Sequence, residues 1–184
     1  WAIETTNQLD KTIFDIVVIT VPAPQVTTLL SGNPVITSAL NDVKFSPCLA
    51  AMIAFEEKIS LKVNTFLNPT SEIAWCARNS SKPLQQLRPD CWILHASSEW
   101  SARNIESEKN IIAKTLLEIF SNKFDLKLPK VQILAGHKWR YAFASVPLKK
   151  DFLISSDKTL FVGGDWCLGN RAENAYDTGL SIAN

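Results

Sequence analysis

Runs of apolar residues alternate with short polar or proline-containing segments along this 184-residue chain. Residues 13–21 form a near-continuous β-branched run, which predicts a strand covered on both faces, as in parallel or mixed sheets. Pro22 and Pro24 end this run, because proline cannot extend a central ladder but can occupy the first turn of a helix. The chain is therefore expected to open with a strand, a proline turn and a short helix over residues 25–30.

The middle of the chain contains several further candidate strands separated by turn-forming residues. They cover residues 48–55, 72–78, 91–96 and 131–143, the last with Gly136 as a site for a bend. Between the last two, residues 107–122 repeat apolar side chains at helical spacing, and Ser107 is placed to cap the first turn. This pattern predicts an antiparallel sheet with one amphipathic helix packed on it.

The end of the chain changes character again. Residues 159–162 predict a short strand, Gly163, Gly164 and Asp165 a turn, and residues 172–183 a helix. The chain thus opens and closes with α/β-type pieces around an antiparallel middle. We predict a mixed fold, α+β with α/β pieces, divided into residues 1–34, 35–150 and 151–184.

Composition and charge exclude several classes of function. The chain is 46% hydrophobic and 20% charged, which is ordinary globular composition. A net charge of +1 without a long Lys or Arg run argues against nucleic acid as a partner. The longest apolar stretch, residues 13–23, is interrupted by Asp15 and is too short to span a bilayer, so no membrane is expected.

The four cysteines are scattered, with no CxxC pair and no His at metal-ligand spacing. We expect no metal site, small buried thiols and a cytoplasmic location.

The sharpest local signal is the strand that ends in Gly163 and Gly164 and is followed by Asp165. Two glycines let the backbone approach a ligand closely, and the carboxylate can accept a hydrogen bond from a hydroxyl. The helix that follows offers unpaired N–H groups to an electron-rich acceptor. Taken alone, this pattern also suits a tight turn with no ligand.

Five ordered segments resemble the renalase-like, FAD-dependent members of the flavin-containing amine oxidase superfamily. The resemblance extends over essentially the whole chain and is far more specific than one glycine motif. The segments are VVITVPAPQ at 17–25, IAWCARNSSKP at 73–83, WILHASSEW at 92–100, HKWRYA at 137–142 and VGGDWCLGN at 162–170.

The resemblance implies an FAD-binding domain of Rossmann-like, glutathione-reductase type, built from residues 1–34 and 151–184, around a substrate domain at 35–150. It places the turn after the first strand near the adenosine half of FAD, the Gly-Gly-Asp turn at the ribityl or pyrophosphate region, and the last helix at the flavin pyrimidine edge. The implied cofactor residues are Val21, Pro22, Ala23, Gly164, Asp165, Ala172, Glu173 and Ala175. Asn174 departs from the family, where many relatives have a glycine.

A dinucleotide site of this kind also needs a G-x-G-x-x-G turn between a strand and a helix. The six glycines of this sequence do not form one. The resemblance implies that the motif lies upstream of Trp1, and the polypeptide as given is expected to bind FAD weakly or not at all.

The predicted substrate pocket consists of two clusters of residues. On a strand through residues 137–141, His137, Trp139 and Tyr141 share one face, while Lys138 and Arg140 share the other. Trp75 precedes a polar, turn-rich loop that begins near Arg78 and Asn79. The predicted pocket residues are Trp75, Arg78, Asn79, Trp139, Arg140 and Tyr141. An ordinary packed sheet face is the alternative for both clusters, and His95 is interpreted as a core residue without a proton-transfer role.

The implied activity is hydride transfer from a reduced organic small molecule to the flavin and then to dioxygen. The substrate is an isomeric dihydronicotinamide nucleotide or an amine, and no catalytic side chain is identified. Two alternatives stay open: a general amine or polyene oxidoreductase on the same scaffold, and a cofactor-free binding module that retains the sheet.

Overall fold

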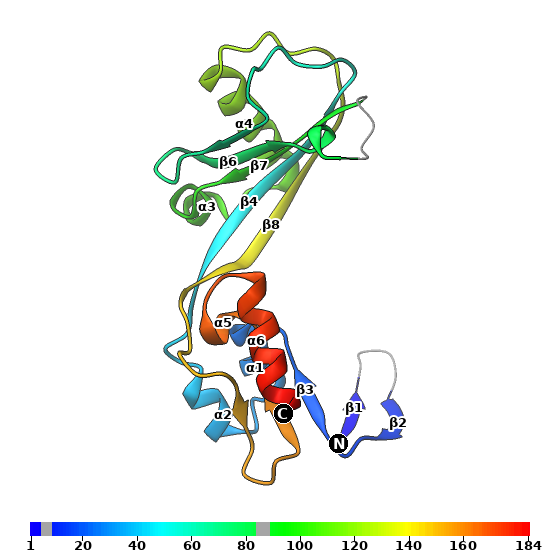
Figure 1. Ribbon diagram of the computed structural model, residues 1–184, viewed down its shortest axis with the longest axis vertical. Coiled ribbons are helices and arrows are strands. Elements are labelled where there is room, and N and C mark those ends of the chain that lie inside the picture. Colours follow the sequence, from blue (N-terminus) through cyan, green and yellow to red (C-terminus); the bar gives the residue numbers. More distant parts are fainter. Residues whose placement is uncertain (5–8, 84–88) are drawn as a thin grey trace. The chain divides into compact units, whose positions relative to one another are not determined.

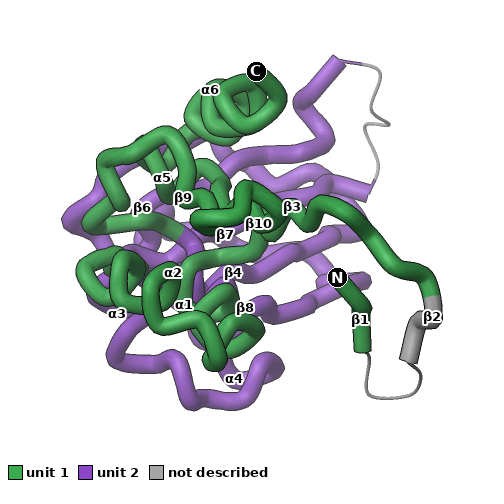
Figure 2. Tube along the Cα trace, turned by 90° about the horizontal axis from the view of Figure 1, so that it is seen from below, with its two compact units in different colours: residues 1–45, 143–184 green, residues 46–142 purple. Residues whose placement is uncertain are grey.

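A computed structural model describes residues 1–4, 9–83 and 89–184, with side chains described from residue 12 onward in the second segment. The chain divides into two compact units (Figure 2). Unit 1 contains residues 1–45 and 143–184, and unit 2 contains residues 46–142. Residues 35–45 and 143–150, which the sequence analysis assigned to the middle domain, belong to unit 1.

Unit 1 is built from both ends of the chain. Strands β1 (Ala2–Glu4) and β2 (Leu9–Ile13) form an antiparallel pair. Strand β10 (Leu160–Val162) lies between β3 (Val17–Ile19), which runs parallel to it, and β9 (Leu153–Ile154), which runs antiparallel. The helices are α1 (Ala23–Leu29), α2 (Pro34–Ala39), α5 (Asp165–Leu168) and α6 (Ala172–Ala183).

The first predicted strand is wrong in length and in burial. Ile13 ends β2, the chain bends at Asp15, and β3 contains three residues instead of nine. Because β3 lies at the edge of its sheet, Ile16 and Val18 are 57% and 48% exposed. The β-branched run therefore belongs to an edge strand and is not covered on both faces.

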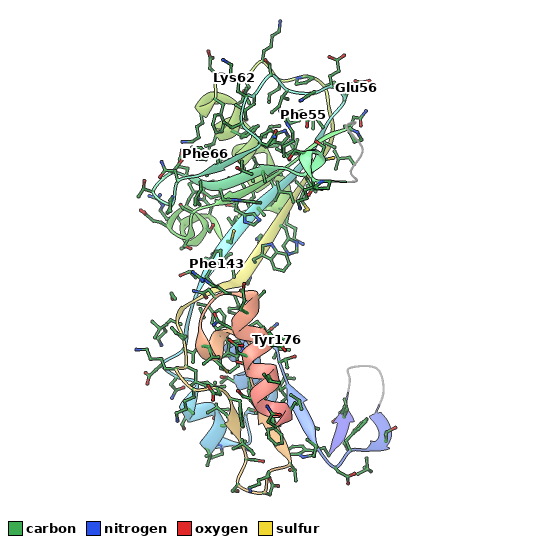
Figure 3. All side chains as sticks on the ribbon, viewed as in Figure 1. Phe55, Glu56, Lys62, Phe66, Phe143 and Tyr176 are labelled. Atoms are coloured by element: carbon green, nitrogen blue, oxygen red, sulfur yellow. The ribbon has the colours of Figure 1, made fainter. Side chains whose placement is uncertain are left out.

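Helices α1, α2 and α5 enclose the core of unit 1. Pro22 precedes the first turn of α1, and the side chain of Asn33 caps α2 by accepting a hydrogen bond from the N–H of Ile36 at 3.3 Å. Helix α6 contributes little to this core, since Thr178 is its one buried residue. Tyr176 lies on this helix and is 70% exposed (Figure 3). The core residues are Ala23, Val26, Ile36, Leu40, Val43, Ala144, Leu153, Leu160, Val162, Trp166 and Cys167.

Unit 2 is a five-stranded sheet with helices (Figure 1). The strand order is β5 (Thr65–Leu67), β6 (Ile73–Arg78), β7 (Asp90–Ala96), β4 (Lys44–Phe55) and β8 (Val131–Val146). Strand pairs β5–β6, β6–β7 and β7–β4 are antiparallel. The helices are α3 (Ser98–Asn104), α4 (Lys109–Lys123) and the short 3-10 turn η1 (Asn79–Ser81). The predicted antiparallel sheet with a packed helix is confirmed.

One face of this sheet forms the core of unit 2. Along β7 the burial alternates, so that Trp92 and Leu94 are buried while Ile93 and His95 on the other face are partly exposed. Helix α4 closes the buried face with Ile112, Leu116 and Phe120, which recur at helical spacing. The opposite face is described below.

Two details of the predicted strand and helix differ from the structure. Helix α4 begins after Glu108, so Ser107 is not its cap. Strand β8 continues through Gly136 without interruption. The glycine serves close packing instead, because a Cβ at position 136 would overlap the backbone carbonyl oxygen of Lys109.

The chain therefore has a mixed α/β fold with antiparallel sheets and packed helices. Among the described residues, no helix combines the length and the apolar character that crossing a bilayer requires.

Candidate functional site

A cavity of about 280 Å³ lies in unit 1 where β3 and β10 end beside α6. Three of the predicted cofactor residues, Gly164, Asp165 and Ala175, meet at this cavity. The full lining is Val18, Thr20, Gly163, Gly164, Asp165, Ala175, Thr178, Gly179 and Ile182. It is mainly apolar, with its polar groups from Asp165 and two threonines.

The two glycines are required by close packing as well as by the turn. A Cβ on Gly163 would lie 2.6 Å from the Cγ2 of Thr178, and one on Gly164 would lie 2.6 Å from the Nε1 of Trp166. Both positions therefore leave bare backbone at the cavity.

Asp165 begins helix α5, and its Oδ1 accepts a hydrogen bond from the N–H of Trp166 at 2.8 Å. In the part of the chain that is described, its Oδ2 accepts no hydrogen bond from the protein. This oxygen can accept a hydrogen bond from a ligand hydroxyl.

The other predicted cofactor residues do not line the cavity. Val21 and Pro22 are partly buried and Ala23 is fully buried at the start of α1. Ala172 and Glu173 are exposed in the first turn of α6. Their contact with a cofactor stays a prediction.

Asn174 has a local role at the start of α6. Its Oδ1 accepts a hydrogen bond from the N–H of Arg171 at 3.1 Å, and its own N–H donates to the backbone carbonyl of Arg171 at 3.0 Å. The side chain therefore folds back on its own helix.

Buried cysteines are kept as thiols. Burial raises the pKa of Cys48, Cys76 and Cys167 to about 11, which is well above neutral pH. Cys167, which follows the candidate cofactor turn, is fully buried. It is thus a poor nucleophile. No group of three or more His, Cys, Asp or Glu side chains among the described residues is arranged to hold a metal ion.

The second candidate surface is the open face of the sheet in unit 2. On β8, Gly136 packs against α4, and Arg140 bonds Glu106 on the same side of the sheet. Because side chains alternate along a strand, the odd-numbered residues His137, Trp139 and Tyr141 point to the opposite face. On β4 and β7, Met52 and Ile93 are paired across the same face.

Two imidazole–indole pairs lie on this open face. The rings of His137 and Trp139 are 4.3 Å apart, and those of Trp75 and His95 are 4.8 Å apart between β6 and β7. Trp139 is 54% exposed and Tyr141 41%. The predicted grouping of His137, Trp139 and Tyr141 is present, and the face also includes His95.

His95 is half-buried beside Trp75 and is not a core residue. Burial lowers its pKa, so the imidazole is neutral at pH 7.

Arg78 lies in a buried network and does not reach the open face. Its guanidinium donates to the side chain of Asn64 at 2.9 Å and to the carbonyl of Ile59 at 3.0 Å. Its Nε lies 3.2 Å from Oδ1 of Asp90, close enough for an ion pair although the angle does not suit a hydrogen bond. Asn79 begins the turn η1 that follows.

Asp90 completes this network. It accepts hydrogen bonds from Ser80 at 2.8 Å, from the N–H of Ile59 at 3.0 Å and from the indole of Trp92 at 3.2 Å. Arg78 and Asp90 are 5% and 1% exposed, which describes a structural ion pair. A substrate contact by Arg78 is untested and finds no support in this geometry.

Arg140 points to the helix side of β8, where Nη1 and Nη2 bond the two carboxylate oxygens of Glu106 at 2.9 and 3.2 Å. The hydrogen bond from Arg140 lowers the pKa of Glu106. This pair is therefore on the other side of the sheet from Trp139 and Tyr141.

Sequence reasoning gave no structural role to two residues that organise the cavity in unit 1, Trp166 and Thr178. The indole N–H of Trp166 donates to the carbonyl of Val21 at 3.1 Å, and the hydroxyl of Thr178 donates to the carbonyl of Gly164 at 3.1 Å. A tryptophan in a four-residue helix or a threonine in the middle of a helix has no local sequence pattern that predicts such a bond.

No family model matches the chain. Among solved structures, it is similar to a candidate protoporphyrinogen oxidase from Exiguobacterium sp. 255-15, with a TM-score of 0.69 and 13% identity over 99% of this chain and 43% of the other. It is also similar to an oxidoreductase from Methanosarcina mazei, with a TM-score of 0.64 and 16% identity over 97% of this chain and 44% of the other.

A third structure, reduced UDP-galactopyranose mutase, gives a TM-score of 0.58 and 11% identity over 98% of this chain and 42% of the other. The chain thus shares its fold with these proteins and covers less than half of the length of each.

Proposed function

We propose that this chain is part of an FAD-dependent oxidoreductase, in which unit 1 holds part of the cofactor and unit 2 provides a wall for the substrate. The observation that carries the proposal is the cavity beside Gly163, Gly164 and Asp165, where bare backbone and a free carboxylate oxygen meet. Solved structures of the same fold include oxidoreductases, which supports this choice.

The residues at the cavity suit one portion of FAD. The free oxygen of Asp165 would accept a hydrogen bond from a ribityl hydroxyl, and the glycines would admit the chain of the cofactor against the backbone. A cavity of about 280 Å³ is smaller than the whole cofactor. We propose that a dinucleotide-binding segment outside this sequence holds the remainder.

When bound, FAD would accept a hydride from a reduced organic substrate and pass the electrons to dioxygen. The open sheet face would contribute orientation through Trp139, His137 and Tyr141, against which a flat ring can stack. Along the 46–55 segment of β4, along β6 and β7, and along the 137–141 segment of β8, the residues that point to this face include no carboxylate and no ammonium group. The face therefore offers aromatic rings on which a flat ring, such as a dihydronicotinamide, can stack, and no carboxylate to pair with a protonated amine.

The deciding experiment compares visible absorption spectra of the full natural polypeptide, expressed with any sequence that adjoins this chain in its gene. We expect flavin bands in the wild type and their loss, or at least a roughly tenfold weaker FAD affinity, in Asp165→Ala. Asp151→Ala removes an exposed carboxylate from the same unit and should retain the bands. A colourless wild type that takes up no added FAD would refute the proposal.

A second candidate function is a cofactor-free interaction module. It is favoured by the exposed edge of β3, where Ile16 and Val18 lie open and the backbone groups of Val18 and Thr20 point away from β10. A wild-type protein without flavin that captures a strand-forming peptide would support this alternative.

A further inference from the structure

Three segments of unit 1 take part in the proposed cofactor site, although they lie far apart in the sequence. They are the turn after β3 at Val21, the Gly164–Asp165 turn after β10, and the first turns of α6. Two buried side chains, Trp166 and Thr178, connect these segments. They are 1% and 2% exposed.

Trp166 connects the first two segments. Its indole Nε1 donates to the carbonyl oxygen of Val21 at 3.1 Å, across 145 positions of the sequence. The same indole packs against Gly164, where a Cβ would lie 2.6 Å from Nε1 and 2.9 Å from Cδ1. Its backbone carbonyl accepts from the N–H of Leu148 at 3.0 Å, which fixes the residue from a third direction.

Thr178 connects the second and third segments. From the middle of α6 its hydroxyl donates to the carbonyl oxygen of Gly164 at 3.1 Å. The N–H of Cys167 donates to the same oxygen at 3.0 Å. Two donors on one carbonyl fix the peptide plane between Gly164 and Asp165, and because that plane is rigid they also fix the direction of the Asp165 N–H.

We propose that Trp166 and Thr178 are positioning residues of the cofactor site, an inference that rests on the proposed function. Trp166 does not line the cavity, and Thr178, which does line it, is assigned this role through its hydrogen bond to the carbonyl of Gly164. The hydrogen bond from Trp166 fixes the position of the Val21 carbonyl relative to the Gly164–Asp165 turn. The hydrogen bond from Thr178 fixes the position of that turn relative to α6. The carboxylate of Asp165 and the start of α6 are then already in one fixed arrangement when a ligand binds, which reduces the conformational entropy that the protein loses on binding.

Three substitutions remove or keep one hydrogen bond each. Trp166→Phe keeps an aromatic ring but loses the N–H donor. Thr178→Val keeps the shape but loses the hydroxyl, and Thr178→Ser restores the hydroxyl. Ile36→Val is the matched control, because it trims a buried residue of the same core at helix α2, away from the cavity.

The first readout is the FAD dissociation constant of the full natural polypeptide, measured well below the unfolding temperature. We expect Trp166→Phe and Thr178→Val to weaken FAD binding by roughly 3- to 10-fold each, which corresponds to one buried hydrogen bond. Thr178→Ser should restore most of the affinity. Ile36→Val should lower the melting temperature without changing the dissociation constant.

The second readout needs no cofactor. Hydrogen exchange followed by mass spectrometry should show faster exchange at residues 25–26, whose N–H groups donate to the carbonyl of Pro22 beside Val21, in Trp166→Phe than in the wild type, with no change in peptides of unit 2. Unchanged exchange there would overturn the positioning role of Trp166.

The outcomes separate the two proposals. If the wild type binds FAD and neither Trp166→Phe nor Thr178→Val changes its affinity, the positioning inference is wrong and the proposed function stands. If the wild type takes up no FAD, the proposed function is wrong, and the inference about a cofactor site is wrong with it.

Discussion

The two units protect their sheets to very different degrees. In unit 2, helix α4 seals one face of a five-stranded sheet, and the ammonium of Lys123 lies 4.7 Å from the centroid of the Phe66 ring on the edge strand β5. In unit 1, the three-stranded sheet ends at β3 with Val18 48% exposed, and α6 buries one residue. The site proposed for the cofactor is thus in the less covered unit.

The difference extends to charges. Unit 2 buries an ion pair, Arg78 with Asp90, whose members find several protein partners. In the exposed ion pairs of unit 2, such as Arg140 with Glu106, both side chains contact solvent. The comparison teaches that unit 2 places a charged pair inside its apolar core, whereas unit 1 leaves apolar residues exposed at the edge of its sheet.

The largest predicted effect concerns the buried pair. Asp90→Ala leaves the guanidinium of Arg78 buried without its carboxylate, and we expect a loss of about 3–5 kcal/mol in the free energy of unfolding. Urea denaturation measures this loss. Glu106→Ala removes the partner of the exposed Arg140 and should leave the midpoint within error. Similar losses in both variants would show that burial does not distinguish the two pairs.

A second prediction tests close packing in unit 2 against open space in unit 1. Gly136→Ala places a methyl group on the carbonyl of Lys109, so β8 or α4 must shift, and we expect a cost of about 1–3 kcal/mol. At Gly32 nothing lies within 4 Å of the point that a Cβ would occupy, and Gly32→Ala serves as the control. Thermal unfolding compares the two, and an unchanged Gly136→Ala protein would contradict the packing described here.

The third prediction concerns the two sheet edges. An exposed apolar edge strand pairs readily with another chain, and a lysine on it opposes this. We expect the chain to associate at high concentration and Val18→Lys to weaken that association at least about tenfold. Leu67→Lys changes the edge strand of unit 2, where the ammonium of Lys123 already lies over Phe66, and should therefore have a smaller effect. Sedimentation velocity gives the measurement, and equal association of wild type and Val18→Lys would refute the role of β3.

The smallest effect is a pH dependence in unit 2. The pKa of His95 is lowered from 6.5 by burial, so the unfolded chain binds more protons than the folded one as pH falls below 6.5. The free energy of unfolding should therefore decrease from pH 7 toward pH 5, and His95→Gln should remove part of this decrease. A wild type and variant with parallel pH profiles would show that His95 does not contribute.

The sequence predicted those elements whose patterns are local. Helix α6 begins and ends where the apolar spacing indicated, and strands β6 and β7 differ from their predicted bounds by one residue each. Helices α2 and α3 were missed because they contain only six and seven residues, which is too short for a clear helical periodicity of apolar positions. The strand over residues 13–21 was overestimated because β-branched composition does not distinguish an edge from a sheet centre.

Among the site residues too, those defined by nearby sequence were predicted better than those positioned by distant residues. Gly164, Asp165 and Ala175 lie in the turn and the helices that follow β10, and the family resemblance selected them, because the turn motif alone also suits a turn without a ligand. The position of Arg78 depends on Asp90, Asn64 and Ile59, none of which is a sequence neighbour, so the residue looked like part of a loop when it is buried. The bond from Trp166 to Val21 crosses most of the chain, and no short motif can contain it.

Unit 1 cannot complete its three-stranded sheet until the C-terminal part of the chain has been synthesised, because its strands come from both ends of the chain. Unit 2 is one continuous segment, so it can complete its contacts while the C-terminal residues are still being added. Strand β3 must wait for β10, about 140 residues later, which at ~5–20 residues per second is a delay of roughly 7–28 s. During that interval residues 16–21 lack β10 as their partner strand, so their apolar side chains are open to other contacts before the cavity beside β10 can form.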